Sequence, residues 1–592
     1  MYQASLDPKS IEINNFLGLN ESIGDTEIKI GEAIYMRNFR ITSNYKLEKR
    51  TGHTTFIDET QPTKVIQGLW YGKILGVSVL IYACNGNVKK KVMPSGAVST
   101  LGTMTDAKTN IFYFQGKLFL LNGTEYKYYD GTTFGNVTSI AYVPKVATGS
   151  PPTGGGTLLE EINVLTGKKS QEFVGNGVAT LYQLVEIGLT SVDSVYVNGV
   201  LKTVTTDYTV DLVNGRVTFV VAPVNLAVVL IAWNKSSTAT PSLVTSNRSS
   251  ILFGPGNDTT VFMWGSTTNP NRRTFSASLD ATYFPANNYT DIGSNQYAIT
   301  DIQPMQGVQI IFKEEQTYYS PAEIAVSPLT GYVYPIYDLN YAIGNVCFDG
   351  VQVVKNNPVS LHGNSAWEWT SSQVKDERNA KDISIKMPVS FGSLDFTTAV
   401  TFDYQKNQEL WINVGSMVYV WNYGNDTWCI YDNISANCFL EVDGVVYFGS
   451  KVGTIERFEG KLTDNGTIIN AVWKSGFIDF GAYEYKKNSR SMWFSIQPAS
   501  RTSVSIKCPT NRNNEDDPVL KTFTKGYTLF DFETIDFDDF TFETNRNPQA
   551  FRIDIKAKKY SYIQFIFSNA QDDETLVFLS FKVDCETTSF VK

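Results

Sequence analysis

The sequence is poor in the residues that most catalytic and metal sites require. Its 592 residues include only two histidines, His53 and His362, and neither has a metal-ligand neighbour at helical spacing. A His-based zinc site and a Ser-His-Asp triad are therefore both poorly provided for. The HExxH, GxSxG, Walker A and GxGxxG patterns are absent. We therefore predict no enzymatic activity, no catalytic or metal-binding residue and no cofactor.

Signals for disulfides, secretion and membrane insertion are also missing. The cysteines form no CxxC pair and no framework spacing; they are Cys84, Cys347, Cys429, Cys438, Cys508 and Cys585. Such scattered cysteines indicate free thiols in a reduced compartment. The first 15 residues lack the basic and apolar regions of a signal peptide, and no apolar run approaches the roughly 18 residues of a membrane helix. We expect a soluble, cytoplasmically made protein without a membrane anchor.

Positive charge is scarce. The chain has 50 Lys and Arg against 59 Asp and Glu, a net charge of −9 and a pI of about 5.1. Proteins that grip nucleic acid present clustered Lys and Arg to the phosphates. The two clusters present, Lys89–Lys91 and Lys556–Lys559, are short and lie in strand-like context, so we interpret both as solvated strand faces. No nucleic-acid-binding residue is predicted.

Helical periodicity is nearly absent, and strand-forming residues are abundant. The best helix candidate, Val374–Lys381, is only about two turns long. The chain has 32 Tyr and 36 Phe, and aromatic residues favour strands. The sequence therefore predicts an all-β protein.

The strands recur as short meanders. In Ile111–Gly131, alternating apolar residues are separated by a turn at Gln115–Lys117 and by an Asn-Gly pair at 122–123. Asn-Gly between apolar runs indicates a type I′ hairpin turn. Related patterns follow at Pro358–Trp369, Glu409–Asn433 and Glu441–Gly460. Repeated hairpins ending in an aromatic residue are typical of propeller blades, although the period is not fixed. A run of stacked sheets or a sandwich is the alternative.

The chain is too long for one core, and shifts in composition suggest its division. Gly149–Gly156 reads as a Gly/Pro linker, and from Leu462 the strands become longer and alternate strictly. We predict an N-terminal extended segment (1–60), a propeller-like body in two parts (61–147 and 239–461), an inserted β-sandwich module (148–238) and a C-terminal β-sandwich (462–592).

The inserted module has its own pattern. It contains Phe173-x-Gly-x-Gly, Val195-x-Val-Asn-Gly, Asp207-Tyr-Thr-Val and Gly215-Arg-Val-Thr-Phe, followed by Ala222-Pro223. This order resembles small β-sandwich modules of phage tail fibres and adaptors. We expect the module on the outside of the body, and we expect the hairpin tips Asn198-Gly199 and Asn214-Gly215 to face a partner such as a fibre.

One acidic segment, Asp531–Glu543, interleaves six carboxylates with phenylalanines. Period-two alternation favours an amphipathic edge strand as the explanation. A cation site and a glycosidase-type pair of carboxylates are the alternatives.

The N-terminal segment carries the most specific pattern. It reads Asn15-Phe16-x-Gly18-Leu19-Asn20, then Met36-x-Asn38-Phe39, then Leu47-x-Lys49-Arg50-x-Gly52. These elements resemble the start of a tailed-bacteriophage structural family of tail tubular or nozzle proteins and packaged-DNA stabilisation proteins of the head–tail channel. The plainer interpretation is a turn followed by an edge strand, with Lys49-Arg50 in a solvated turn.

The resemblance implies a β-propeller-like body closed into a homo-oligomeric ring, with a hexamer favoured. It implies a virion protein of the phage tail, assembled in the host cytoplasm, that contacts the adaptor or portal side and the fibres. During genome ejection DNA would pass through the ring, and an acidic lumen would let it slide without sticking.

The same segment is predicted to take part in assembly. Its apolar residues are too few for a core of their own, so they must be buried against the body or a neighbouring subunit. The candidate assembly-interface residues are Phe16, Leu19, Met36, Phe39, Lys49 and Arg50.

Three functions are therefore open. The first is a structural ring component of a phage tail. The second is a carbohydrate-binding or polysaccharide-degrading tail or receptor-binding protein. The third is a cellular propeller scaffold, although the strict blade signatures of such scaffolds are missing.

Overall fold

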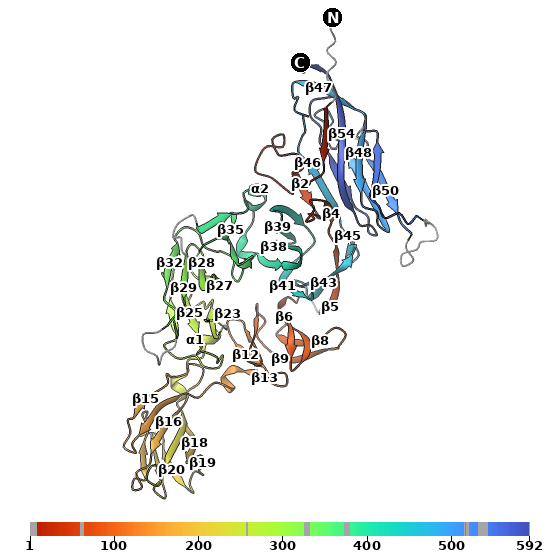
Figure 1. The fold of residues 1–592 in the computed structure, drawn as a ribbon. Helices are drawn as coiled ribbons and strands as arrows, with labels where there is room; N and C mark the ends of the chain where they lie inside the picture. Colours follow the sequence, from red (N-terminus) through yellow and green to blue (C-terminus); the bar gives the residue numbers. More distant parts are fainter. Residues whose placement is uncertain are drawn as a thin grey trace. The chain divides into compact units, whose positions relative to one another are not determined.

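The computed structural model describes residues 9–59, 64–255, 259–324, 332–371, 379–513, 515–516, 520–530 and 543–590. In these residues the chain consists mainly of β-strands, numbered to β54 in Figure 1. The two α-helices described, α1 (Ser242–Thr245) and α2 (Pro388–Phe391), have four residues each. The 3₁₀ turns of the described residues lie at Val137–Ser139, Ser236–Thr238, Phe396–Thr398 and Gln405–Asn407. The prediction of an all-β fold is confirmed.

Two of the sequence predictions fall mostly outside the described residues. Of the acidic segment 531–543, only Glu543 is described. Of the candidate helix Val374–Lys381, only its end is described, and Ala380 and Lys381 belong to strand β36 (Ala380–Asp382) instead. No helix in the described part of the chain is long and apolar enough to cross a membrane.

The chain divides into two compact units. Unit 1 comprises Met1–Ile66 with Asn345–Lys592, and unit 2 comprises Gln67–Gly344. This division joins the predicted segments 1–60 and 462–592 in one unit, because N-terminal strands are incorporated into C-terminal sheets.

Unit 2 contains four antiparallel sheets of four strands, each following the order of the chain. The first two consist of β6 (Ile66–Ile74), β7 (Val77–Cys84), β8 (Asn87–Val92) and β9 (Val98–Thr103), then β10 (Asn110–Phe114), β11 (Lys117–Leu121), β12 (Tyr126–Tyr129) and β13 (Phe134–Asn136). The next two consist of β23 (Ser249–Phe253), β24 (Thr260–Trp264), β25 (Arg272–Phe275) and β26 (Tyr289–Asp291), then β27 (Ile299–Met305), β28 (Val308–Lys313), β29 (Thr317–Pro321) and β32 (Tyr337–Asn340). A small hairpin, β30 (Glu323–Ile324) with β31 (Tyr332–Val333), extends from the last sheet.

Unit 1 contains three more meanders of this kind. They consist of β33 (Gln352–Val354), β34 (Asn357–His362), β35 (Ser365–Trp369) and β36; then β37 (Val400–Tyr404), β38 (Glu409–Val414), β39 (Met417–Asn422) and β40 (Thr427–Tyr431); then β41 (Ala436–Val442), β42 (Val445–Ser450) and β43 (Thr454–Lys461). The last sheet gains its fourth strand from the N-terminal segment, because β5 (Gly52–Asp58) pairs with β43. Seven four-stranded meanders are the strand arrangement of propeller blades.

The N-terminal segment also joins a blade to the C-terminal region. Strand β2 (Ala33–Arg37) lies parallel to β40 and antiparallel to β46 (Ala471–Ser475). One nine-stranded sheet results, continuing through β53 (Ile566–Asn569), β49 (Arg501–Lys507) and β50 (Phe523–Thr528). Without β2, the blade and the C-terminal strands would not be hydrogen-bonded to each other in this sheet.

A second C-terminal sheet packs against the first. Its eight strands are β1 (Lys9–Ile13), β3 (Phe39–Ile41), β4 (Leu47–Lys49), β47 (Tyr485–Ser489), β48 (Met492–Ile496), β51 (Gln549–Ile553), β52 (Ala557–Tyr560) and β54 (Val577–Phe590). Trp473 and Phe567 of the nine-stranded sheet are stacked with ring centroids 5.2 Å apart, and Phe567 lies 4.3 Å from Phe578 of β54. This aromatic layer forms the centre of a two-sheet sandwich. A short hairpin, β44 (Thr463–Asp464) with β45 (Thr467–Ile468), precedes it.

The turns between strands follow the sequence prediction only in part. Gln115-Gly116 and Asp443-Gly444 have positive φ at both residues, as a type I′ turn requires. At Asn122-Gly123 only the glycine has positive φ, and the Asn122 side chain accepts hydrogen bonds from the backbone N–H groups of Thr124 and Glu125. The predicted type I′ turn at 122–123 is therefore wrong, and an Asx turn takes its place.

The inserted module is a two-sheet sandwich within unit 2. One sheet holds β14 (Lys145–Ser150), β15 (Thr157–Leu158), β16 (Lys168–Val174), β18 (Ser191–Val197), β19 (Val200–Leu201) and β22 (Val228–Asn234), and the other holds β17 (Leu181–Gln183), β20 (Tyr208–Asp211) and β21 (Arg216–Phe219). Its own core is aromatic, with Phe173, Tyr182, Phe219 and Trp233 all buried. The linker prediction at 149–156 needs correction, because Gly149 and the buried Ser150 end strand β14, which pairs with β16.

We expect the module to fold by itself when β14 is included. A fragment of residues 143–238 should unfold cooperatively in urea, followed by the fluorescence of the buried Trp233. A fragment of residues 150–237 lacks β14, which lies between β15 and β16, so its midpoint should be lower. Non-cooperative unfolding of the longer fragment would contradict this prediction.

An internal deletion tests whether the rest of unit 2 folds without the module. Asn163 donates to the carbonyls of Tyr142 and Thr282, so the stretch around it anchors the module to the neighbouring sheets. The Lys235 N–H donates to the Gly167 carbonyl, so joining these two residues removes 168–234 and keeps the anchor. Unit 2 should remain folded in that variant.

Candidate functional site

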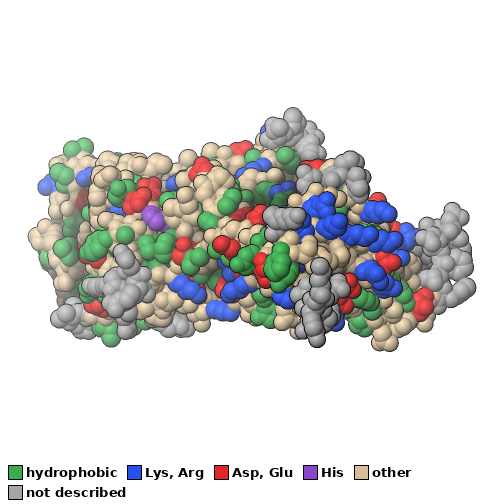
Figure 2. Space-filling view, turned by 90° about the horizontal axis from the view of Figure 1, so that it is seen from above, with side chains coloured by type: hydrophobic (Ala, Val, Ile, Leu, Met, Phe, Trp, Pro, Cys, Tyr) green, Lys and Arg blue, Asp and Glu red, His purple; other side chains and the backbone are tan. Residues whose placement is uncertain are grey.

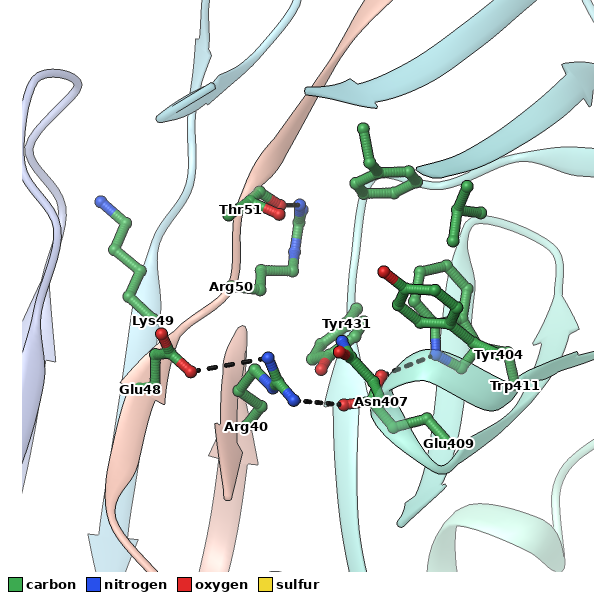
Figure 3. Close-up of a pocket in the computed structure, with 12 residues that line it drawn as sticks. Arg40, Glu48, Lys49, Arg50, Thr51, Tyr404, Asn407, Glu409, Trp411 and Tyr431 are labelled. Atoms are coloured by element: carbon green, nitrogen blue, oxygen red, sulfur yellow. Dashed lines mark hydrogen bonds and ion pairs between the residues drawn. The ribbon is translucent and has the colours of Figure 1, made fainter. Parts of the chain in front are cut away.

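A small cavity in unit 1 lies between the N-terminal segment and the last two blades. Its volume is about 80 Å³. The N-terminal segment contributes Arg40 and residues 48–51, and the blades contribute Tyr404, Asn407, Glu409, Trp411, Tyr431, Val446 and Phe458. Figure 3 shows Arg40 of the N-terminal segment pointing across to Glu409, whereas Lys49 points away from it.

Arg40 connects two carboxylates across this cavity. Its Nη2 lies 3.2 Å from Glu409 Oε1, and its Nη1 lies 3.5 Å from Glu48 Oε2 (Figure 3). Trp411 Nε1 donates to the other Glu409 oxygen at 3.0 Å. Burial raises the pKa of Glu409, against the effect of Arg40. Burial also works to lower the pKa of Arg40, but the negative charges around it, Glu409 first, raise that pKa above its ordinary value. Arg40 is therefore held as a cation between the two acids.

Arg50 forms a second buried ion pair at the edge of the cavity. Its two terminal nitrogens donate to Asp464 at 2.9 and 2.6 Å, in a bidentate pair whose side chains are 3% and 2% exposed. Its Nε donates to Asn38 Oδ1 at 2.9 Å, and the same Asn38 side chain donates to Asp432 Oδ1 at 2.7 Å. The network ties the N-terminal segment to the last blades.

His53 lies between two buried acids in the same region. Its Nδ1 is 3.3 Å from Glu456 Oε2, and its Nε2 is 3.6 Å from Asp464 Oδ1. The ring makes edge contacts with Phe448 and Phe458 at 5.0 and 5.5 Å between centroids. Both carboxylates lie about 400 residues away in sequence, so no local motif signals this arrangement.

Lys49 is buried on the opposite side of its strand. Its Nζ donates to Asn569 Oδ1 at 2.7 Å and to the Gln571 carbonyl at 2.8 Å. Burial lowers the pKa of Lys49 to about 8. Lys49 and Arg50 are 6% and 5% exposed, so the interpretation of this pair as a solvated turn is wrong.

The candidate assembly-interface residues lie inside unit 1. Phe16, Leu19, Met36 and Phe39 are at most 1% exposed, and Lys49 and Arg50 are buried as described. Phe16 packs edge-on against Trp473 and Phe578 at 5.3 and 5.9 Å. The expectation that these six side chains form a contact surface is therefore corrected. The four apolar residues belong to one core cluster with residues of the blades and of the C-terminal strands of the same chain, which the sequence pattern does not reveal.

The two candidate docking tips lie at opposite ends of the inserted module. Asn198 and Gly199 are exposed, and the Asn198 N–H donates to the carbonyl of Val228 at the start of β22. Asn214 is exposed at the other end. The preceding Leu212 accepts a hydrogen bond from the Leu189 N–H, and the next residue, Thr190, donates to the carbonyl of Asn234 at the end of β22. Gly215 is buried, and a Cβ there would lie 1.9 Å from the Glu186 carbonyl oxygen. The two tips therefore cannot form one docking surface.

The charged groups of the cavity hold parts of unit 1 together and leave little room for a ligand. Its charged groups are paired, and about 80 Å³ has room for a few water molecules, whereas ligand pockets usually span about 300–1,000 Å³. In the described residues no group of three or more His, Cys, Asp or Glu is arranged to hold a metal. All six cysteines are free thiols, five of them buried.

No protein-family model and no curated protein sequence matches the chain. Among solved structures, the computationally designed Ika8 protein is similar at 9% identity and a TM-score of 0.32, covering 68% of this chain and 99% of that one. The AfRom2 CNH domain is similar at 5% identity and a TM-score of 0.34, over 69% of this chain and 99% of that one. An exo-β-1,3-galactanase from Phanerochaete chrysosporium is similar at 8% identity and a TM-score of 0.17, over 81% and 96%.

Proposed function

We propose that this protein is a structural component of a bacteriophage tail, forming an oligomeric ring of the nozzle or tubular type. The proposal rests on the positions that the residues of the N-terminal pattern occupy in unit 1. Its residues occupy positions that few other residue types could fill, and they connect three sheets of unit 1.

The glycines and the asparagine of the pattern show this most clearly. A Cβ on Gly18 would lie 2.8 Å from the Trp428 carbonyl oxygen, and a Cβ on Gly52 would lie 2.0 Å from that of Thr463. Asn38 has a φ of +55°, a conformation that asparagine tolerates better than most residues. Its side chain contacts both Arg50 and Asp432. These demands favour the family resemblance over a generic turn and edge strand.

The remaining parts of the proposal follow from the resemblance. The ring, with a hexamer favoured, would contact the adaptor or portal side of the tail, and DNA would pass through it during genome ejection without sticking. Docking of a fibre or another tail protein falls on the Asn198-Gly199 end of the inserted module. Exposed apolar side chains gather there; Val200, Leu201, Val224 and Leu226 are 59%, 59%, 65% and 74% exposed.

A carbohydrate-degrading role finds less support. The cavity beside Glu409 is too small for a sugar residue, and Arg40 binds both of its carboxylates. The acidic segment 531–543, which motivated this alternative, lies outside the described residues except for Glu543.

Electron microscopy of the purified full-length chain tests the proposal. We expect closed rings of one symmetry, because the family implied by the N-terminal pattern assembles in that way. Light scattering after size exclusion should give the mass of the same oligomer as a multiple of 66.0 kDa. A 66.0 kDa monomer in both measurements, at micromolar and at tenfold higher concentration, would contradict the proposal.

A further inference from the structure

A larger pocket opens in the C-terminal sandwich of unit 1. Its volume is about 370 Å³. Its first wall follows β49 and reaches the start of β50, and its second follows β51 and reaches the start of β52. The residues that line it are Cys508, Thr510, Arg512, Asn513, Leu520, Lys521 and Phe523 in the first wall, and residues 554–558 in the second. Each sheet of the sandwich therefore contributes one wall.

The pocket has an excess of positive charge. Arg512, Lys521, Lys556 and Lys558 line it together with a single acid, Asp554. Asp554 is already engaged, because its Oδ1 accepts from Ser491 Oγ at 2.9 Å and lies 3.0 Å from Arg552 Nη2. None of the four cations pairs with an acid in the described residues. By contrast, Arg40, Arg50 and Lys49 of unit 1 each bind an acid or another acceptor.

The geometry keeps these cations accessible and close together. All four residues are exposed. Lys556 has a φ of +52°, and its N–H donates to the carbonyl of Arg490, a further exposed cation beside the pocket. The backbone N–H of Arg512 donates to Thr510 Oγ1, and Thr510 and Asn513 exchange backbone hydrogen bonds. In the view of Figure 2, Lys and Arg side chains gather toward the right of the molecule.

A bound anion would relieve the repulsion among these cations. The chain as a whole carries a charge of −9, so the clustering of these four cations here runs against its composition. Like charges repel one another, and an anion that binds them stabilises the folded state by mass action. Lys556, Lys558 and Lys559 are exposed to solvent, as the sequence predicts, and Lys556 and Lys558 also line the pocket.

We propose that this pocket binds a ligand bearing phosphate or sulfate groups. Arg512 offers a planar fork that matches an oxyanion in a bidentate manner, and the lysines act as point charges around it. A volume of about 370 Å³ falls in the range of small-molecule sites, so the ligand is a phosphorylated or sulfated group of about sugar size. This proposal is independent of ring formation.

The test uses the full-length chain and isothermal titration with three probes: inorganic pyrophosphate, a heparin-derived sulfated disaccharide and sucrose. We expect one site per chain for at least one anionic probe and none for sucrose. The double variant Arg512→Gln/Lys558→Gln should weaken binding by about tenfold or more, and Lys525→Gln/Lys582→Gln, with the same charge change outside the pocket, should stay within about twofold. Near-wild-type unfolding of both variants verifies that the fold is retained.

The pattern of binding identifies the source of the oxyanion. Preference for the disaccharide supports a saccharide carrier, and equal affinity for pyrophosphate supports a free phosphate compound. Failure of both anions to bind, or equal weakening by the two double variants, would overturn the proposal. A 20-base-pair duplex that binds more tightly than both small anions and requires Arg512 would overturn it too, because the site would then belong to nucleic acid.

Discussion

A chain that lacks residues 1–40 is expected to lose the folded structure of unit 1, while unit 2 stays folded. The deletion removes β1 and β2, and β2 is the strand that joins β40 to β46. It also removes Phe16, whose ring packs on Trp473 and Phe578. Limited proteolysis should digest residues 345–590 and leave a protected fragment near 67–344.

A single substitution in the same segment is a milder test of the same packing. Phe39 is fully buried, so Phe39→Asp should lower the free energy of unfolding of unit 1 by about 4 kcal/mol or more. Ile30→Asp is the matched control, because Ile30 lies in the same segment and is 54% exposed. We expect a change of less than about 0.5 kcal/mol for the control. Urea unfolding followed by tryptophan fluorescence measures both.

Retention of a native unit 1 in the deletion variant would show that the packing of residues 9–40 is dispensable. If the packing is as described, this deletion cannot serve as a test of ring assembly. An oligomer lost together with a folded unit says nothing about an interface, so assembly must be tested with exposed residues instead.

The second large effect is expected at the Arg50–Asp464 pair. Arg50→Met should lower the free energy of unfolding by about 3–5 kcal/mol, because it leaves the buried Asp464 carboxylate without its partner. Asn38 would lose its hydrogen bond from Arg50 in the same variant. The double variant Arg50→Met/Asp464→Leu should be less destabilised than the single one, since no unpaired charge remains.

An exposed pair in the same unit is the control. Lys582 and Asp584 lie 3.8 Å apart with side chains 46% and 44% exposed, so Lys582→Met should cost less than about 1 kcal/mol. Equal effects of Arg50→Met and Lys582→Met would mean that the Arg50 network does not stabilise unit 1. Chemical denaturation of the full-length chain, with the two units followed separately by proteolysis, measures both variants.

Local features of the fold were predictable from the sequence because their causes are local. Alternating apolar residues and turn-forming pairs placed the meanders at 111–131, 358–369, 409–433 and 441–460, where the structure has β-strands. The pair Asn198-Gly199 has positive φ at both residues, as a type I′ turn requires. Asn122-Gly123 shows the limit of such reasoning, since the asparagine side chain bonds the following backbone instead.

The site was less predictable, because its charges meet across long separations in sequence. Arg50 and Asp464 are 414 residues apart, and His53 and Glu456 are 403 apart. Lys49-Arg50 belongs to the N-terminal sequence pattern, but no periodicity distinguishes a buried pair of charges from a solvated turn. In the C-terminal pocket, Lys556 and Lys558 belong to one basic cluster of the sequence, whereas Arg512 and Lys521 belong to a different stretch and only the pairing of the sheets brings them near.

By itself, then, the sequence determined that this protein is all-β, that its strands form short meanders, and that the apolar residues of its N-terminal segment must be buried. Only the tertiary structure decided where they are buried. Strand β1 pairs with β54, which ends the described chain, and β2 lies between β40 and β46. The physical reason is that strand propensity and turn chemistry act over a few residues. Pairing partners are selected instead by the apolar area and hydrogen bonds that the whole chain can satisfy at once.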